Sequence, residues 1–203
     1  MDREITRFKS RRNAVLLVQT DEGTVVRKQY PQEERCLRER MVYEKLRGSS
    51  LPHAQLLCAS ARELTMTWLP GCTLLEVLER QESTGVLCRA AWDQLARWLT
   101  EFQKETGLTV TDVNLRNFLY EESGQTLWGV DFEECGEESL VVIAGRVAAY
   151  ILHYAPEETP LKLQTAEYVL QQFSGYLNIA AEELRREAKT QEALLLRHRK
   201  NRT

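Results

Sequence analysis

Two carboxylates and one carboxamide lie close together in the second half of the sequence, beside short apolar runs. The segment TDVNLRNFLY, residues 111–120, places Asp112 five residues before Asn117, and GVDFEEC places Asp131 fourteen residues after Asn117. Oxygen ligands are the ones that Mg²⁺ prefers, with water and phosphate in its remaining positions. The spacing therefore favours a site for Mg²⁺ and a nucleotide. The competing interpretation is a set of polar turn residues, because Asp and Asn are frequent in turns.

Phosphoryl transfer asks a protein for positioning and charge compensation more than for covalent chemistry. Asp112 is the candidate acceptor of the proton of an incoming hydroxyl, and Asn117 and Asp131 are the candidate metal ligands. A cation is also needed on the nucleotide phosphates. We expect it to be Lys28, near the end of TVVRKQY, and Arg27 on the opposite face of that strand is the competing candidate.

A phosphate-binding lysine on a strand is usually held by a carboxylate from the nearby helix. We assign Glu39 as this partner of Lys28. Two alternatives stay open. Glu44, one turn later, can take the same role, and Glu39 can instead form an ordinary surface pair with Arg35 or Arg40 at helical spacing.

The first third of the sequence is predicted to be rich in strands. Residues 14–30 favour two strands with a tight turn at residues 21–23, and ITRFKS before them is a candidate for a further strand. AQLLCASARELTMTWL predicts a second hairpin or two short strands. Between the hairpins, Pro31 begins a predicted helix that runs to about Leu46.

That predicted helix carries apolar residues at helical spacing. Its stripe consists of Leu37, Met41 and Leu46, with Val42 beside Met41. A stripe of this kind is typical of the side of a helix that faces the core.

Pro70-Gly71 is the strongest linker signal in the chain. Beyond it the sequence is mostly helical, with one small β-element around residues 117–132. The helical segments are expected near 73–82, 88–105, 139–154, 160–177 and 179–198. Strands followed by helices predict an α+β fold in two lobes, residues 1–69 and residues 70–203, and a cleft between lobes is a usual place for a small ligand.

Composition describes an ordinary globular protein, with 43% hydrophobic and 28% charged residues. The net charge of −3 gives no basic field for nucleic acid. No apolar run approaches the roughly 18 residues of a membrane span, and the first residues are too charged for a signal peptide. The five cysteines are scattered without a CxxC pair, so neither a zinc site nor a disulfide framework is indicated. We expect a cytoplasmic protein without a membrane partner.

TDVNLRNFLY resembles the catalytic loop of the protein-kinase-like superfamily, which has the spacing D-x-x-x-x-N. Together with GVDFE it looks more like the aminoglycoside and choline phosphotransferase branch, with its small bacterial kinases, than the eukaryotic protein kinases. VVRK resembles the strand of the phosphate-binding lysine, and LRERMVYEKL resembles the helix of its glutamate partner. TMTWLPGCTL is similar to the hinge between the lobes. The resemblance covers roughly residues 13 to 155.

The resemblance implies a two-lobed protein-kinase-like fold with a small antiparallel sheet and one helix in the first lobe. It implies an ATP- and Mg²⁺-dependent phosphotransferase that moves the γ-phosphate to a hydroxyl of a small molecule. Asp112 would be the catalytic base, with Asn117 and Asp131 as Mg²⁺ ligands. Lys28 would contact the α- and β-phosphates, with Glu39 as its partner.

Adenine would be held by backbone groups of the hinge, at Thr67, Trp68 and Leu69. Trp68 itself is either an exposed hinge aromatic against the base or a core tryptophan, and we favour the core. Trp92, Trp98 and Phe102 are expected in the core at near-helical spacings.

The sequence departs from the family pattern at several places. Val110 stands where the loop usually begins with histidine, and SLVVIAGRV lacks the Asp that usually braces the loop. FKSRRNAV contains no glycine where a glycine-rich phosphate loop is expected, and Arg11, Arg12 and Asn13 are the side chains that could contact phosphate there. These departures favour an alternative function, a pseudokinase that binds nucleotide weakly or not at all and acts as a regulatory or scaffold module.

The C-terminal segment LLLRHRKNRT is locally basic and raises a third possibility, a kinase-like protein associated with nucleic acid. A solvated, frayed C-terminus is the simpler interpretation, so nucleic acid is not among the expected partners. His53 and His153 have no partner at ligand spacing, and we expect structural roles for both. The sequence predicts neither the hydroxyl acceptor nor an oligomeric state.

Overall fold

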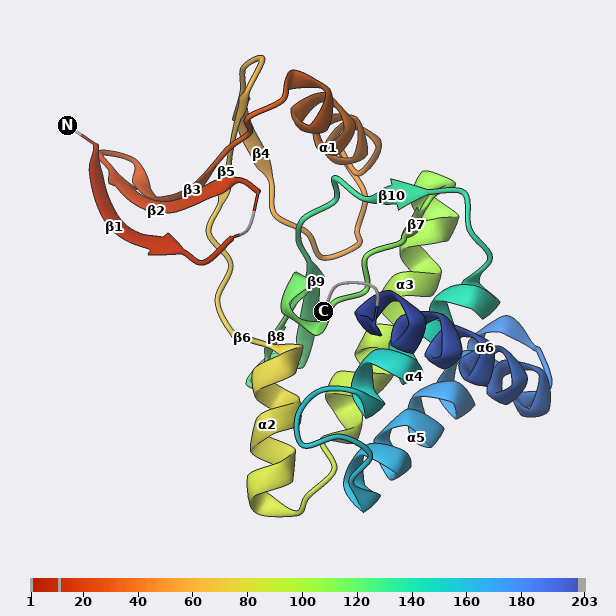
Figure 1. Ribbon diagram of the computed structural model, residues 1–203. Coiled ribbons are helices and arrows are strands. Elements are labelled where there is room, and N and C mark those ends of the chain that lie inside the picture. Colours follow the sequence, from red (N-terminus) through yellow and green to blue (C-terminus); the bar gives the residue numbers. More distant parts are fainter. Residues whose placement is uncertain (1, 11, 201–203) are drawn as a thin grey trace.

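The computed structural model describes residues 2–10 and 12–200. Its first part is an antiparallel sheet of five strands in the order β1–β2–β3–β5–β4 (Figure 1). The strands are β1 (Arg3–Phe8), β2 (Ala14–Thr20), β3 (Gly23–Gln29), β4 (Leu56–Ala59) and β5 (Glu63–Thr67). Both predicted hairpins and the further strand before the first hairpin are confirmed.

The central strand of this sheet is β3. Thr20 pairs with Gly23 at the turn, where Gly23 has a φ of 132° that residues with side chains rarely adopt. The register then places Lys28 opposite Val15 of β2 and opposite Leu64 of β5. Lys28 therefore lies between two apolar neighbours in the middle of the sheet.

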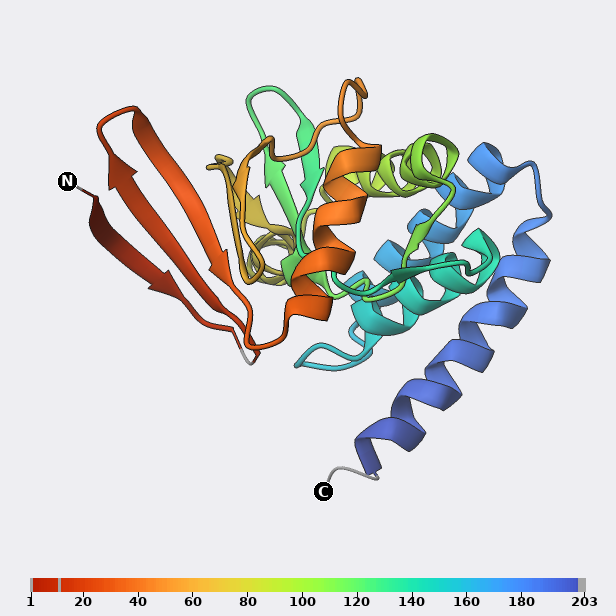
Figure 2. The same ribbon diagram turned by 90° about the horizontal axis from the view of Figure 1, so that it is seen from above.

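Helix α1 (Glu33–Lys45) lies between the sheet and the helical part of the chain, as the orange helix of Figure 2 shows. The predicted stripe is wrong at two positions, because Leu37 is 55% exposed and Met41 is 51% exposed. At 100° per residue these two positions fall on the side opposite to Glu39, which is buried. The helix turns Glu39 inward, and the two large apolar side chains therefore face solvent.

The rest of the chain is largely helical. Its helices are α2 (Leu74–Thr84), α3 (Arg89–Thr106), α4 (Leu140–Leu152), α5 (Pro160–Leu177) and α6 (Ala181–Lys200). Capping groups explain why these positions were predictable: Thr73 and Glu76 form a capping box at the start of α2, and Thr159 caps α5 just before Pro160. The chain is therefore an α+β protein with a strand-rich first part and a helical second part.

Two small sheets lie within the helical part. The first has the order β6–β8–β9, made of β6 (Cys72–Thr73), β8 (Phe118–Glu121) and β9 (Thr126–Gly129), and it confirms the predicted β-element. The second, which the sequence did not predict, pairs β7 (Thr109–Val110) with β10 (Cys135–Gly136). A short 3₁₀ turn, η1 (Leu115–Asn117), precedes β8. These short elements hold the segments that contain Asp112, Asn117 and Asp131.

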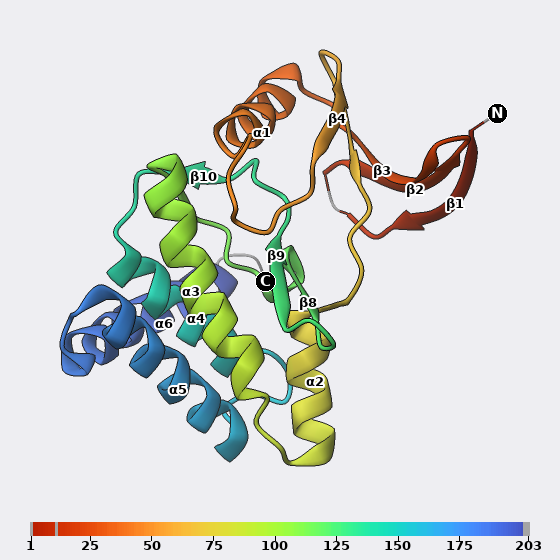
Figure 3. The ribbon, with the colours of Figure 1, turned by 180° about the vertical axis from the view of Figure 1, so that it is seen from behind.

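Helix α3 runs through the core, beside β9 and α5 (Figure 3). Trp92, Trp98 and Phe102 are buried on it, as predicted. Trp98 stacks on Phe132 with an interplanar angle of 6° and a centroid distance of 6.1 Å. Because Phe132 follows Asp131 directly, this aromatic stack fixes the backbone that carries Asp131.

Gly129 gives a testable measure of this packing. A Cβ atom at Gly129 would lie 2.3 Å from the Cη2 atom of Trp98, which cannot move within the core. Gly129→Ala is expected to lower the free energy of unfolding by about 1–3 kcal/mol. Gly175→Ala is the matched control: Gly175 is exposed on α5 with no neighbour within 4 Å, so we expect a gain of about 0.5–1 kcal/mol. Urea unfolding checks both, and equal stabilities for the two variants would contradict the packing described.

Helix α6 packs along α4 and extends past it (Figure 2). Arg199 donates to the carboxylate of Glu157 at 2.8 Å and to the backbone oxygen of His153 at 2.7 Å. The predicted fraying of the C-terminal segment is thus wrong for residues 197–200, and residues 201–203 lie outside the described part. Of the helices that the structure describes, none combines the length and the apolarity needed to cross a membrane.

Candidate active site

Lys28 joins three separate segments of the chain. Its side chain is buried, with 4% of the residue exposed, and its Nζ donates to Glu39 Oε2 at 2.6 Å and to Asp131 Oδ1 at 2.5 Å. Glu39 comes from α1 and Asp131 from the turn after β9. The hydroxyl of Tyr30 donates to the same Oε2 atom at 2.7 Å. The structure therefore brings together three of the residues that the sequence singled out.

The competing assignments lie elsewhere. Arg27 forms an ion pair with Asp2 on the other face of the sheet. Glu44 pairs with Arg40 at 2.7 Å on the exposed side of α1. Neither Arg27 nor Glu44 is positioned to replace Lys28 or Glu39 in this contact.

The charge of Lys28 is well compensated. Burial alone would lower the pKa of its ammonium group, but Glu39 and Asp131 together outweigh that effect and raise the pKa above its ordinary value. Lys28 is therefore a permanently charged cation at neutral pH, with one carboxylate partner on each side.

Asp112 and Asn117 lie on one loop that folds back on itself. The Nδ2 atom of Asn117 donates to the backbone oxygen of Asp112 at 3.0 Å, and the N–H of Asn114 approaches Asp112 Oδ1 at 3.3 Å. Among the described residues, no donor approaches Oδ1 of Asn117. Burial is the largest influence on Asp112 and, with the nearby charge of Asp131, raises the pKa of its carboxyl. Asp112 is consequently a stronger base than an exposed aspartate.

Asp131 is held beside this loop by a backbone hydrogen bond of the preceding residue, Val130. The N–H of Val130 donates to the backbone oxygen of Asn117 at 2.8 Å, which places Asn117 and Asp131 on adjacent backbone segments. Asp131 has a φ of 65°, in the left-handed region that few residues other than Gly, Asn and Asp adopt. The carboxylate that this conformation presents is 62% buried and meets Lys28. The two predicted metal ligands are thus neighbours in space.

Helix α4 holds the loop through the basic side chain of Arg146. Arg146 donates to the backbone oxygen of Thr111 at 2.8 Å and forms a bidentate pair with Glu138, both bonds 2.8 Å long. At the other end of the loop, the hydroxyl of Tyr154 donates to Asn114 Oδ1 at 2.8 Å. Sequence reasoning missed both residues, since it looked only for a carboxylate in this helix.

Val110, which stands where a histidine was expected, is a buried residue of β7 opposite Cys135. The site therefore fixes its loop through strand pairing and through α4.

Of the three residues predicted as a hinge, Thr67 ends β5, and Trp68 and Leu69 follow it. Thr67 is still hydrogen-bonded, its N–H to the backbone oxygen of Gln55 at 3.0 Å. The ladder between β3 and β5 continues to the pair of Val25 with Thr67. Trp68 is 48% exposed, so the prediction of a core tryptophan is wrong. The reason is its position beyond the sheet, where the chain crosses to β6 without a layer above it.

The segment after Asp131 also reaches the first part of the chain. Glu133 Oε2 accepts a hydrogen bond from Asn13 at 2.9 Å, and Glu133 Oε1 lies 3.2 Å from Arg35 of α1. Glu134 accepts a hydrogen bond from Arg12 at 2.7 Å. Arg11, which the sequence suggested beside Arg12, lies outside the described residues. No local pattern could have predicted these contacts, because they join residues more than 95 positions apart.

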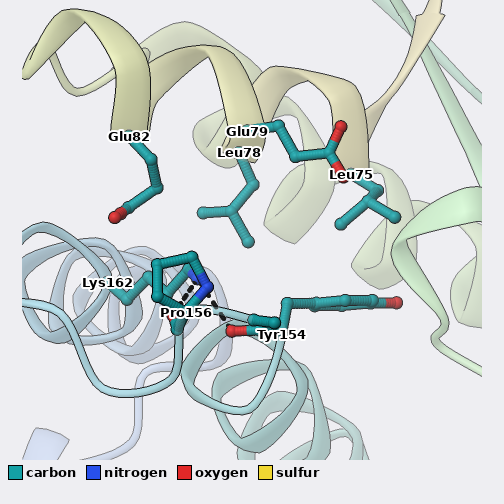
Figure 4. A pocket seen from close by; sticks show the side chains of 8 residues that line it. Leu75, Leu78, Glu79, Glu82, Tyr154, Pro156 and Lys162 are labelled. Atoms are coloured by element: carbon teal, nitrogen blue, oxygen red, sulfur yellow. Dashed lines mark hydrogen bonds between the residues drawn. The ribbon is translucent and has the colours of Figure 1, made fainter.

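A separate cavity of about 120 Å³ lies between α2 and the segment after α4 (Figure 4). Lys162 is buried beside it and donates to the backbone oxygens of Tyr154, at 2.8 Å, and of Pro156. Leu75, Leu78 and Glu79 of α2 face it from above, in the view of Figure 4. The cavity is too small for a nucleotide, and its buried ammonium group, that of Lys162, already donates to two backbone oxygens.

His53 and His153 have structural contacts. His53 Nδ1 lies 2.7 Å from the backbone oxygen of Leu51. His153 is buried, and its ring nitrogens face Glu157 at 3.2 Å and Glu192 at 2.9 Å. The predicted lack of a partner at ligand spacing is therefore wrong for His153, because Glu157 lies four residues further along the chain. The contact with Glu192 joins the end of α4 to α6.

No protein-family model matches the chain, and no curated protein matches it significantly. The assignment of a function therefore depends on the residues and the geometry described above.

Proposed function

We propose that the chain is an ATP- and Mg²⁺-dependent phosphotransferase with a protein-kinase-like, two-lobed fold. It would transfer the γ-phosphate of ATP to a hydroxyl of a small molecule. The cytoplasmic location expected from the sequence is part of this proposal.

The contact of Lys28 with Glu39 and Asp131 carries the proposal. A buried ammonium group between two carboxylates costs desolvation energy and is weak evidence for stability alone. Here the three residues come from a central strand, the helix beside the sheet and a loop of the helical part. They match, residue by residue, the lysine, its glutamate partner and the metal-binding aspartate that the family resemblance implies.

The donor set fits Mg²⁺. Asn117 offers a carboxamide oxygen that no described group occupies, and Asp131 offers the carboxylate oxygen that is not bonded to Lys28. Hard oxygen ligands, few in number, are typical of protein sites in which Mg²⁺ also binds phosphate. When bound, the metal ion would neutralise charge on the phosphates. Lys28 would contact the phosphates beside it, and Asp112 would accept the proton of the acceptor hydroxyl.

The charges around the site support a divalent cation. Five carboxylates gather there against three cationic side chains, which leaves two formal negative charges. The carboxylates are those of Glu39, Asp112, Asp131, Glu133 and Glu134, and the cations are Lys28, Arg12 and Arg35. A polyanion such as ATP would be repelled from this site unless metal ions accompanied it.

A small acceptor is supported by the segment between Asp131 and α4. This segment comprises only residues 132–139, and hydrogen bonds join it to Thr109, Thr111 and Arg12. This leaves no long segment on which a protein substrate would bind.

The proposal is tested by incubating the full chain with ATP and a panel of small hydroxyl compounds, with and without Mg²⁺. We expect ADP release that depends on both Mg²⁺ and one class of acceptor, with a phosphorylated product detected by mass spectrometry. Nucleotide binding without any need for Mg²⁺ and without a phosphorylated product would favour the pseudokinase instead.

A further inference from the structure

Arg12 is a cation at the mouth of the proposed site. It lies in the loop between β1 and β2, and its guanidinium pairs with Glu134 Oε1 at 2.7 Å and lies 3.8 Å from Glu133 Oε1. The side chains of Arg12 and Glu134 are 53% and 42% exposed. Ion pairs with this much solvent around them contribute little stability, about 0–1 kcal/mol by the general range for exposed pairs. The pair can therefore open at small cost.

Glu134 is fixed beside the candidate base. Its backbone oxygen accepts hydrogen bonds from the N–H of Thr111 at 3.0 Å and from the Thr111 hydroxyl at 2.8 Å. Thr111 directly precedes Asp112. The pKa of Arg12 is raised, first by the hydrogen bond with Glu134, and Asp112 is among the carboxylates close enough to contribute. Arg12 thus extends from the sheet to the loop that carries the proposed base.

The loop that carries Arg12 stays in place without the pair. Asn13 anchors it through the bond from Nδ2 to Glu133, which is buried. The N–H of Asn13 is used within the loop, since it approaches the hydroxyl of Ser10 at 3.3 Å. The loop therefore presents a side-chain cation to the site, and its backbone amide at Asn13 is not free for phosphate. An open hollow of about 450 Å³, lined by Ser10, Arg12, Asn13 and others, lies beside it and leaves room for the Arg12 side chain to change direction.

We propose, on the basis of the proposed function, that the nucleotide phosphates and Glu134 compete for Arg12. Arginine binds carboxylate and phosphate with the same planar set of donors. Without nucleotide, the Glu134 carboxylate occupies the guanidinium. A phosphate, which carries more negative charge, displaces it, and Arg12 then does by side chain what a glycine-rich loop does by backbone. Glu134 is in this respect a built-in competitor of the nucleotide.

Lys28 and Arg35 are less suited to such an exchange. Lys28 has two buried or half-buried carboxylate partners at 2.6 Å or less. Breaking these ion pairs would leave Glu39 without its cation. Arg35 is 29% exposed and lies on α1, where it contacts Glu133 at 3.2 Å and lies 3.7 Å from Glu134. Arg12 alone among these three combines an exposed side chain with an exposed partner.

Calorimetric titration of the full chain with ATP in Mg²⁺, and separately with adenosine, tests the competition. The variants are Arg12→Met and Glu134→Gln. The matched control is the exposed pair of Arg38 and Glu34 on α1, bonded at 2.8 Å, in the variants Arg38→Met and Glu34→Gln. Thermal unfolding without ligand confirms that each variant is folded.

Competition predicts opposite signs for the two changes. Arg12→Met should weaken binding of Mg²⁺–ATP by about tenfold or more, the usual cost of losing a hydrogen bond to a charged group. Glu134→Gln should tighten it about two- to fivefold, because a weak ion pair no longer has to open. Adenosine binding and both control variants should stay within about twofold of the wild type.

If Arg12→Met and Glu134→Gln change the affinity for Mg²⁺–ATP in the same direction, the ion pair only holds the two segments together. That result would overturn the competition. So would an unchanged affinity in Glu134→Gln, or an equal loss of adenosine binding in Arg12→Met. A wild type that binds no Mg²⁺–ATP would overturn the proposed function itself, and the competition with it. If the wild type binds Mg²⁺–ATP and Arg12→Met binds it equally well, the competition is overturned but the proposed function is not.

Discussion

Lys28→Met is expected to lower the free energy of unfolding by about 3–5 kcal/mol, the usual cost of removing one partner from a buried ion pair. The methionine would leave Glu39, of which 1% is exposed, with Tyr30 as its remaining donor. The Oε1 atom of Glu39 is already buried without a hydrogen bond. An uncompensated carboxylate would then remain in the core between the sheet and α1. Chemical denaturation in urea measures the loss.

The control for Lys28→Met is Arg40→Met on α1, the helix that carries Glu39. Arg40 pairs with Glu44 at 2.7 Å, but both side chains are more than 40% exposed, so a change within about 1 kcal/mol is expected. If Lys28→Met proves too unstable to purify, Glu39→Gln gives a second reading, because it removes the charge and keeps the shape. A Lys28→Met variant no less stable than Arg40→Met would contradict the buried contact.

Asp112→Asn should lower the turnover of Mg²⁺–ATP with its acceptor by about 10²–10⁴-fold, the range for loss of a positioned general base. Asparagine keeps the side-chain oxygen that the N–H of Asn114 approaches, and the bond from Asn117 goes to the backbone oxygen of residue 112. The loop should therefore keep its shape. Affinity for Mg²⁺–ATP should change only severalfold, because the base acts on the acceptor hydroxyl.

Steady-state kinetics with the acceptor found in the panel check this result. Asp93→Asn on α3 is the same chemical change at a residue that bonds to Tyr176, away from the site, and its turnover should match the wild type within about twofold. Turnover of Asp112→Asn at the level of Asp93→Asn would show that Asp112 is not the base.

The helices were predictable because their signals are local. Thr73 with Glu76, and Thr159 before Pro160, mark helix starts within four residues of sequence. Gly85 and Gly107 mark the ends of α2 and α3 with φ of 70° and 72°. The order of strands and helices follows from the same kind of signal.

Two of the failures arise from contacts that no local pattern encodes. Leu37 and Met41 suggested the buried side of α1, but the pairing of Glu39 with Lys28 decides which side faces inward. The two-residue strands β7 and β10 have no periodicity to detect, and only their pairing defines them. Local hydrophobic pattern is a weak guide where one buried charge fixes the orientation of a helix.

The candidate site was predictable in part. Spacing singled out Asp131, and the order of strand and helix singled out Lys28 and Glu39; these three residues lie in contact. Spacing could not find Arg146, because its target is the backbone oxygen of Thr111, an atom that every residue type has. It could not assign a partner to Arg12 either, since Glu134 is 122 residues away.

The most direct test of the nucleotide site is thermal unfolding of the wild type and of Asp131→Asn, each with and without ATP and with and without Mg²⁺. Ligand at about one hundred times its dissociation constant adds about 2.7 kcal/mol of stability, which for a chain of this size raises the Tm by about 5–10 °C. We expect that rise in the wild type only when both ATP and Mg²⁺ are present. We expect it to be absent in Asp131→Asn, whatever the Tm of that variant without ligand. No rise in the wild type, or an equal Mg²⁺-dependent rise in Asp131→Asn, would contradict the proposed site.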